Sequence, residues 1–312
     1  MRSAGKSVDS DRSGSILATT SPSAAKPIAV RPGVPGVRLV AFVVWFCFIA
    51  AGPVGAHGPL HEQIAELNAR IDHDPRDAGL YLRRGELYGL HGDCDAALAD
   101  FDRVARLAPA LAAVDLARGK ALFRAGRLAP AQDALDRFLA REPDHPDGNV
   151  TRARVLVKLG DYQAAVRDYG RAIAMWERPE PEHYVEWAQA FAALGDLERA
   201  VRALDDGIAK LGPIVSLQIP AIDLELAVGR VEAALARVDA IASRAPRPEP
   251  WLARRGEILE RAGRAAEARR AYEVALAGLR LARATRATGE LESKLRAALT
   301  RLGEDRGTEK EP

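Results

Sequence analysis

Cysteine, methionine and aromatic residues are scarce in this chain of 312 residues. It has two cysteines, two methionines and only 5% aromatic residues. Two cysteines cannot form a disulfide framework, and no Cys-x-x-Cys pair is present. Gly-x-Ser-x-Gly, His-Glu-x-x-His and phosphate-loop motifs are also missing. We therefore expect a noncatalytic protein with no cofactor.

Long apolar runs are absent as well. The run Leu39–Ala51 contains thirteen residues without a charge, which is short for a membrane span and typical of the apolar core of a secretory signal. Arg31 and Arg38 precede it, and small residues follow it as far as Ala56. We predict that residues 1–56 are a signal peptide with a long polar leader, cleaved after Ala56, and that the mature protein is periplasmic or secreted.

An uncleaved leader is the alternative for the same segment. The chain would then be an assembly factor anchored in the inner membrane and facing the periplasm. In both cases we expect membrane contact only through this segment. Cys47 lies inside it, so cleavage would leave Cys94 without an internal disulfide partner.

An excess of basic charge is missing too. The whole chain has a formal net charge of +2, with 45 Lys and Arg against 43 Asp and Glu. Residues 1–56 account for six basic and two acidic residues, which leaves 39 against 41 in the mature chain. Nucleic acid is therefore not an expected partner.

A regular period is the strongest positive feature. Glycines recur at spacings of 34, 34, 35, 34 and 34 residues, and each is followed five residues later by an alanine. A fixed period near 34 residues indicates a chain built by stacking one small unit. The glycines are Gly92, Gly126, Gly160, Gly195, Gly229 and Gly263.

Each unit has the pattern of two helices joined at its glycine. Apolar and small residues recur every three or four positions on both sides of the glycine, as expected of helices with one buried face. The glycine fits a left-handed helix end, and aspartates such as Asp93, Asp161 and Asp196 can cap the next helix. Prolines seventeen or eighteen residues after four of the glycines end the second helix.

This pattern resembles the tetratricopeptide repeat. The best match runs from Ala78 to Leu111 and carries Tyr81, Gly85, Tyr88, Ala97, Phe101 and Pro109 in family positions. The resemblance implies an all-α, right-handed α-solenoid of antiparallel helix pairs, with six repeats over residues 78–280. It also implies a superhelix whose first helices line a concave groove that binds a protein or peptide.

The flanking segments and one repeat depart from the pattern. We expect an N-terminal capping helix within residues 57–77, a C-terminal capping helix over 281–302, and a disordered tail over 303–312. The fifth repeat has Pro220 near the start of its first helix, and Ile222 and Glu225 at positions that usually carry a small and a bulky apolar residue. We expect that helix to be short or tilted, and to pack as a degenerate repeat.

The candidate binding residues occupy one equivalent inward position on each first helix. Lys120, Arg124, Arg154 and Lys158 would form a positive band in the middle of the array, suited to an acidic or carboxylate-bearing peptide. The alternative is that these residues are only the solvated face of amphipathic helices. The inward residues are Glu86, Lys120, Arg154, Gln189, Asp223 and Glu257.

Two histidines suggest a second kind of site. Cleavage after Ala56 would leave His57 with a free amine beside its imidazole, and His61 lies four residues further on. Such groups can chelate copper or another transition metal. A metal-handling accessory protein is therefore an alternative function.

Overall fold

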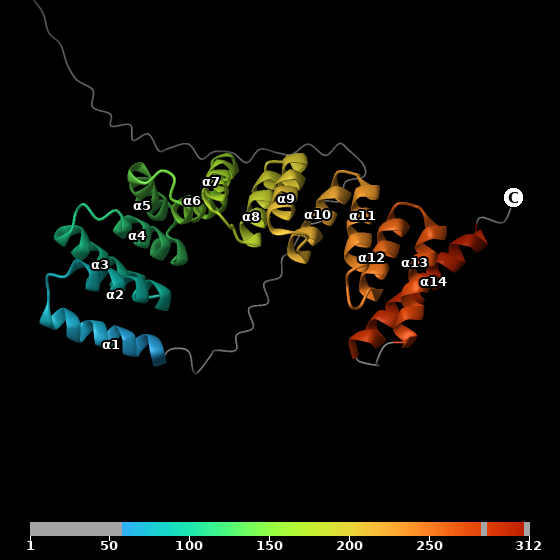
Figure 1. Ribbon diagram of the computed structural model, residues 1–312, viewed down its shortest axis with the longest axis horizontal. Helices are drawn as coiled ribbons and strands as arrows, with labels where there is room; N and C mark the ends of the chain where they lie inside the picture. The colour runs from blue at the N-terminus through green and yellow to red at the C-terminus, as the bar shows by residue number, and fades with distance from the viewer. Residues whose placement is uncertain (1–57, 282–285, 309–312) are drawn as a thin grey trace, which may run out of the picture. The chain divides into compact units, whose positions relative to one another are not determined.

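All regular secondary structure in the described part of the chain is helical. The computed structural model describes residues 58–281 and 286–308, and its helices all fall within the unit Pro53–Pro312 (Figure 1). The predicted leader and His57 lie outside the described residues. The helices are α1 (Gly58–His73), α2 (Ala78–His91), α3 (Cys94–Leu107), α4 (Ala113–Arg124), α5 (Leu128–Arg141), α6 (Pro146–Leu159), α7 (Tyr162–Met175), α8 (Pro181–Ala193), α9 (Leu197–Leu211), α10 (Val215–Ala227), α11 (Val231–Ala242), α12 (Glu249–Arg261), α13 (Ala265–Leu281) and α14 (Arg286–Thr308).

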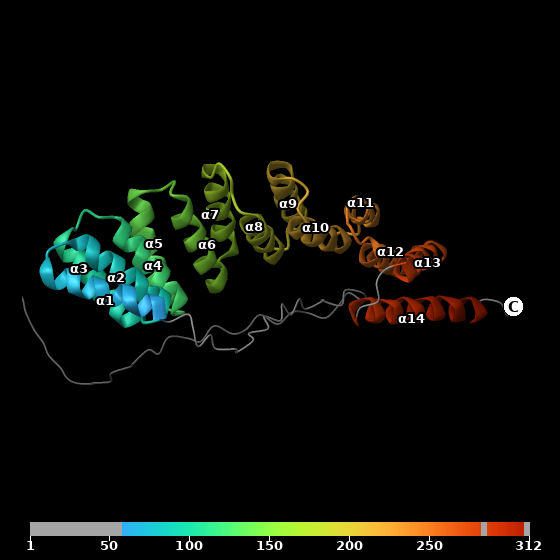
Figure 2. The same cartoon turned by 60° about the horizontal axis from the view of Figure 1, so that its bottom comes forward.

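Six helix pairs follow one another between Ala78 and Leu281 in the described chain. The pairs are α2/α3, α4/α5, α6/α7, α8/α9, α10/α11 and α12/α13, and each second helix also contacts the first helix of the next pair (Figure 2). First helices of neighbouring pairs touch as well, as in α2 with α4, α4 with α6 and α8 with α10. This arrangement is an α-solenoid of helix pairs, as the sequence predicts.

The turn glycines have the predicted backbone conformation. Gly160 has a φ of 85° and ends α6, and its five counterparts also have positive φ. Asp161 then accepts a hydrogen bond from the N–H of Ala164 at 3.0 Å, which caps α7. Asp93 and Asp196 cap α3 and α9 in the same way. A residue that tolerates the left-handed region and a capping carboxylate thus together close each of these turns.

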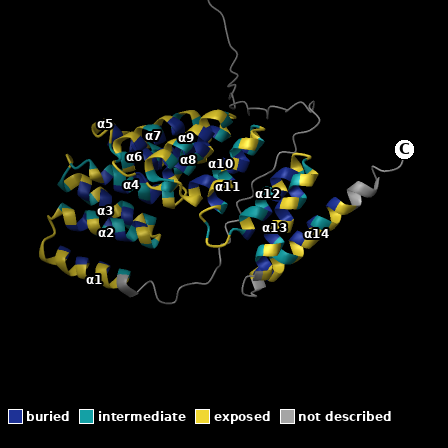
Figure 3. Cartoon of the chain, turned by 45° about the vertical axis from the view of Figure 1, so that its right-hand side comes forward, coloured by how far each residue is buried: buried dark blue, intermediate teal, exposed yellow. Residues whose placement is uncertain are grey.

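The buried faces explain the small residues of the repeat. Ala97, Ala131 and Ala165 have no exposed surface, and Figure 3 shows buried residues on the facing sides of the helices. A Cβ added to Gly85 would come within 2.6 Å of the ring of Phe101. The two helices of a pair therefore approach closely only where the side chain is small.

The ends of the array differ in part from expectation. α1 packs against α2, as a capping helix should, and α14 packs against α13. However, α14 continues to Thr308, so residues 303–308, which we expected to be disordered, are helical. Residues 309–312 lie outside the described range. In the described residues, no helix combines the length and apolarity required to cross a membrane.

The fifth pair answers part of the prediction that its first helix is short or tilted. α10 contains Pro220 in its interior but has 13 residues, as many as α8 and α12, so it is not short. Its tilt stays a prediction. Ile222 is buried, and Glu225 is only 4% exposed. Glu225 is tolerated because it forms ion pairs with Arg237 at 3.2 Å and Arg230 at 3.6 Å. Glu225 can therefore occupy a position that is usually apolar, because Arg237 on α11 pairs with its buried carboxylate.

Candidate functional site

The predicted inward residues lie on the first helices of the six pairs. Glu86, Lys120, Arg154, Gln189, Asp223 and Glu257 lie one each on α2, α4, α6, α8, α10 and α12, and all are partly or fully exposed.

Three of the predicted cations share one cavity. A hollow of about 280 Å³ is lined by Lys120 and Arg124 of α4, by Arg154 of α6 and by five other residues. We call it the basic hollow. Lys158, at the C-terminal end of α6, is exposed but does not line it. The remaining lining residues are Phe123, Asp147, Val150, Thr151 and His183.

A smaller hollow of about 170 Å³ adjoins it on the α2 side. Lys120 and Arg124 line both hollows, and Glu86 lines only the smaller one. Leu90 also lines the smaller hollow, with 58% of its surface exposed. The two hollows therefore form one continuous surface across α2, α4 and α6, with an apolar side chain at its edge.

The cations of the basic hollow are not equally available. Arg154 donates from Nε to both carboxylate oxygens of Glu186, at 3.1 and 2.9 Å. Lys120 Nζ lies 3.3 Å from the Asp147 carboxylate, in a partly exposed pair. Arg124 is exposed, and within the described residues it forms no ion pair. Arg124 is therefore the cation best placed to meet a new carboxylate.

His183 is a feature of the hollow that the sequence analysis missed. Its ring stacks on Trp176 with centroids 4.2 Å apart, and its Nδ1 accepts the backbone N–H of Glu180 at 3.2 Å. Burial lowers the pKa of His183, and the positive Arg154 lowers it further. The neutral imidazole is thus favoured, and because Nδ1 is an acceptor its proton lies on Nε2 as a hydrogen-bond donor. The Glu-x-x-His sequence at the start of α8 is the signal that could have identified it.

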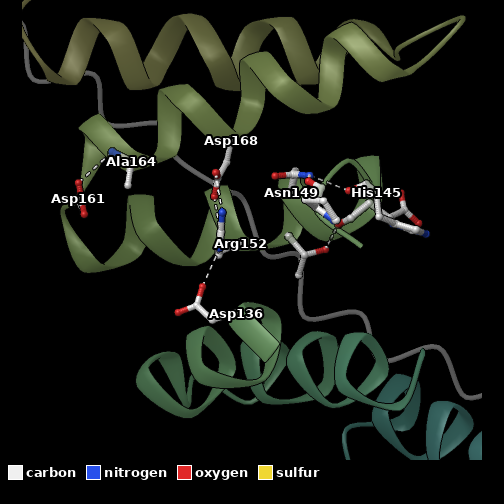
Figure 4. A network of polar contacts seen from close by, with 10 residues as sticks. Asp136, His145, Asn149, Arg152, Asp161, Ala164 and Asp168 are labelled. Carbon is white, nitrogen blue, oxygen red and sulfur yellow. Dashed lines mark hydrogen bonds and ion pairs between the residues drawn. The ribbon is translucent and has the colours of Figure 1, made fainter. Parts of the chain in front are cut away.

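A polar network fixes the helix that carries Arg154. Arg152, two residues earlier on α6, donates to both oxygens of Asp168 at 2.7 and 2.9 Å and to Asp136 at 2.8 Å (Figure 4). At the start of α6, Asn149 donates to the carbonyl of Pro143 at 2.8 Å. Asp136 and Asp168 belong to the preceding and following helices, so the network joins three successive elements.

The acidic inward residues of the fifth and sixth pairs are also paired. Arg254 of α12 reaches Asp223 at 2.6 Å and Glu257 at 3.2 Å. Gln189 is exposed between the basic and acidic regions. The structure therefore brings Lys120, Arg124 and Arg154 together, and it places Asp223 and Glu257 in a separate cluster with one arginine.

The predicted metal ligands are only partly described. His61 is exposed on α1, and its ring lies 4.7 Å from that of His91 on α2, an approach that the sequence did not indicate. His57 is outside the described residues. Across the residues that the structure does describe, no group of three or more histidine, cysteine or acidic side chains is arranged to hold a metal ion.

The fold and this surface define a class: a helical-repeat protein with a charged, hollowed face on its first helices. Family models described as tetratricopeptide repeat match residues 113–145 and 150–213. These ranges correspond to α4/α5 and to α6 through α9. Within these ranges the chain therefore matches the tetratricopeptide repeat.

Curated proteins match parts of this chain in sequence. DnaJ homolog subfamily C member 3 of Rattus norvegicus is 32% identical over 108 residues, which cover 35% of this chain and 21% of that protein. Its Homo sapiens counterpart is 24% identical over 172 residues, covering 48% and 34%. The chain thus spans a fifth to a third of the length of these curated relatives.

A solved structure supports the fold. The crystal structure of PilW, described as a widely conserved type IV pilus biogenesis factor, is 19% identical, with a TM-score of 0.50. The alignment covers 59% of this chain and 85% of that one. At this level of identity the likeness concerns the fold alone.

Proposed function

We propose that the chain is a noncatalytic interaction scaffold that binds an acidic or carboxylate-bearing segment of a protein partner at the basic hollow. The observation that carries this proposal is the placement of Lys120, Arg124 and Arg154 around one cavity, with Arg124 unpaired in the described chain. Stacked repeats expose extended surfaces of this kind, which suits binding to another protein.

The surroundings of the hollow suit a peptide. A carboxylate would form a charge-assisted hydrogen bond with Arg124, while the partly exposed pair of Lys120 and Asp147 gives way readily. His183 adds a neutral N–H donor from the wall. Leu90 offers an apolar contact at the neighbouring edge. Together these groups favour a segment with acidic residues beside an apolar one.

Paired affinity capture tests the role of Arg124. The mature chain and its Arg124→Glu variant are each used as bait with an exported fraction, and bound proteins are quantified by mass spectrometry. Arg171→Glu, at an exposed arginine of α7, is the matched control. Partners should be lost with Arg124→Glu and kept with Arg171→Glu. Equal recovery with all three baits would refute a role for the hollow.

Export is the proposed setting for this activity. It is supported by the apolar run Leu39–Ala51 and by the small residues Val54, Gly55 and Ala56, which precede the predicted cleavage site. An uncleaved inner-membrane anchor is the alternative setting. Amino-terminal sequencing of the native protein tests export with cleavage: a chain that starts at His57 supports it, and one that starts before residue 40 contradicts it.

A further inference from the structure

A third hollow lies away from the basic hollow and the smaller hollow beside it, where the fifth and sixth helix pairs meet. Its volume is about 480 Å³. Two connections border it: residues 212–214, which join α9 to α10, and residues 243–248, which join α11 to α12. The first is the shortest and the second the longest of the described connections between successive pairs. The irregular fifth repeat therefore coincides with a cavity at the loop edge of the array.

The walls of this hollow are mainly apolar. Val215 of α10, Ile241 of α11 and Trp251 of α12 line it. Apolar surface also continues beyond it, because Val215 and Ile219 are 42% and 43% exposed. Trp251 and Ile219 line a neighbouring hollow of about 240 Å³. Exposed apolar side chains around a concave site are typical of a docking surface.

Hydrogen-bond donors that could bind an anion also line this hollow. Arg244 lines the hollow, is exposed, and forms no ion pair among the described residues. Arg247 also lines it, and its only described ion pair is a loose one with Glu249 at 3.8 Å. Both guanidinium groups can therefore donate to a bound anion.

A buried amide adds a donor from the wall. Gln218 is only 7% exposed, and its Oε1 accepts from Arg237 at 3.4 Å. In the described chain its amide nitrogen has no hydrogen-bond partner. The N-terminus of α10 is also close by, because Val215 is its first residue, and Ile214 provides no capping side chain. The free N–H groups of a helix start favour a negative charge.

We propose that this hollow binds the C-terminal residue of a partner polypeptide that ends in a large apolar side chain. One cavity has both apolar walls and N–H donors that can bind an anion. Its ligand must therefore carry an apolar side chain and a negative charge close together. Neighbouring side chains of an extended peptide point to opposite sides, so an internal acidic–apolar pair fits poorly. A C-terminal residue carries its carboxylate and its side chain on one Cα. Pro213 and Arg244 line the hollow and are exposed, so the rest of the peptide can leave past them.

Fluorescence polarisation with labelled peptides tests this site. The peptides have the form Gly-Ser-Gly-Ser-Xaa, where Xaa is Leu, Ile, Phe or Trp, each with a free carboxylate or a C-terminal amide. At least one free acid should bind, and its amide should bind at least about tenfold more weakly, as expected for loss of a charge-assisted hydrogen bond. If no free acid binds up to about 1 mM, or if acids and amides bind equally, the proposal fails.

Matched variants locate the binding. Arg244→Gln should weaken binding of the free acid about tenfold and leave the amide unchanged. Val215→Glu should abolish binding while retaining the fold, because an acidic residue is favourable at a helix start. Arg171→Gln on α7 and Val274→Glu on α13, which is 57% exposed, are the controls and should bind normally.

Two further outcomes would overturn the proposal. Normal peptide binding by both Arg244→Gln and Val215→Glu would place the peptide elsewhere. Binding of sodium laurate in the absence of any peptide binding would assign the hollow to a fatty acid. Arg124→Glu should leave peptide binding here unchanged, so failure at this site and failure at the basic hollow are distinguishable.

Discussion

Arg124 and Arg154 line the same hollow, but within the described residues only Arg154 is held by a carboxylate, that of Glu186. The pair with Glu186 spans 32 residues and joins α6 to α8. Arg154 is therefore oriented and partly neutralised, whereas Arg124 keeps its charge available. This difference determines which substitutions test binding and which also disturb the fold.

Substitutions at Arg124 and at Glu186 should change the affinity for an acidic partner in opposite directions. Arg124→Gln removes the available cation and should weaken binding about tenfold, whereas Glu186→Gln releases Arg154 and should strengthen it several-fold. Titration calorimetry with a captured partner measures both. Arg171→Gln serves as the control. A loss of affinity in Glu186→Gln at unchanged stability would contradict the assigned roles.

Stability should fall below about pH 6.5 through His183. The folded state lowers the pKa of this imidazole, chiefly by burial, so the unfolded chain takes up its proton at a higher pH than the folded chain. The stabilisation is complete above the unfolded pKa, which is near 6.5, and is lost as the pH falls from there through the folded pKa. Urea unfolding of wild type and His183→Gln over this range isolates the contribution. A folded-state pKa above 6.5, measured by NMR, would disprove it.

The buried ion pair between α6 and α7 should dominate local stability. Asp168 is 6% exposed and accepts hydrogen bonds from Nε and Nη2 of Arg152. Asp168→Ala should therefore cost about 2 kcal/mol, because the half-buried Arg152 loses two charge-assisted hydrogen bonds and keeps only its bond to Asp136. The double variant Arg152→Met with Asp168→Leu should recover most of that loss. Circular dichroism during urea unfolding provides the comparison.

An exposed ion pair is the control for the effect of burial on stability. Arg127 and Asp95 are bonded at 2.9 Å, but Asp95 is 81% exposed at its side chain. Asp95→Ala should change stability by no more than about 0.5 kcal/mol. Equal losses for Asp168→Ala and Asp95→Ala would show that burial does not control the strength of these pairs.

Three glycine-to-alanine substitutions should change the stability of the fold by different amounts and for different reasons. Gly160→Ala should cost about 1 kcal/mol because of its φ of 85°, although its Cβ would meet no atom within 4 Å. Gly256→Ala should cost about 2 kcal/mol because the added Cβ would clash with the ring of Tyr272. Gly289→Ala, in open space within α14, should stabilise by about 0.5 kcal/mol. Thermal unfolding measures all three, and a uniform effect would contradict these explanations.

Structural features that depend only on residues of one repeat could be predicted from the sequence. The period located turn glycines such as Gly160 and caps such as Asp161, because both depend on the local backbone. Fixed spacing also placed Lys120 and Arg154 on equivalent sites of neighbouring first helices. Their common cavity follows from that spacing once the helices are stacked.

Contacts between repeats could not be predicted in the same way. The pairing of Arg154 with Glu186 depends on side-chain reach between two helices, which the period alone does not determine. The sequence nevertheless contains one pattern that indicates contacts between repeats. Arginines directly after three turn glycines bond acidic residues 32 positions earlier: Arg127 with Asp95, Arg230 with Glu198 and Arg264 with Glu232.

The fifth repeat shows a different limit. Pro220 suggested a short or tilted helix, but α10 has 13 residues with this proline in its interior. Glu225 suggested a defect, but Arg237 on α11 pairs with it. Both residues were judged from the family pattern, and the compensating partner lay in a different helix.

Site-specific photo-cross-linking tests the central claim most directly. A photoreactive amino acid at Leu90, 58% exposed beside Arg124, is compared with one at Val274, 57% exposed on α13. We predict that position 90 cross-links to a partner segment rich in Asp or Glu, and that Arg124→Glu abolishes this product. Cross-linking of the same partner only from position 274, or products at position 90 that persist in Arg124→Glu, would contradict binding at the basic hollow.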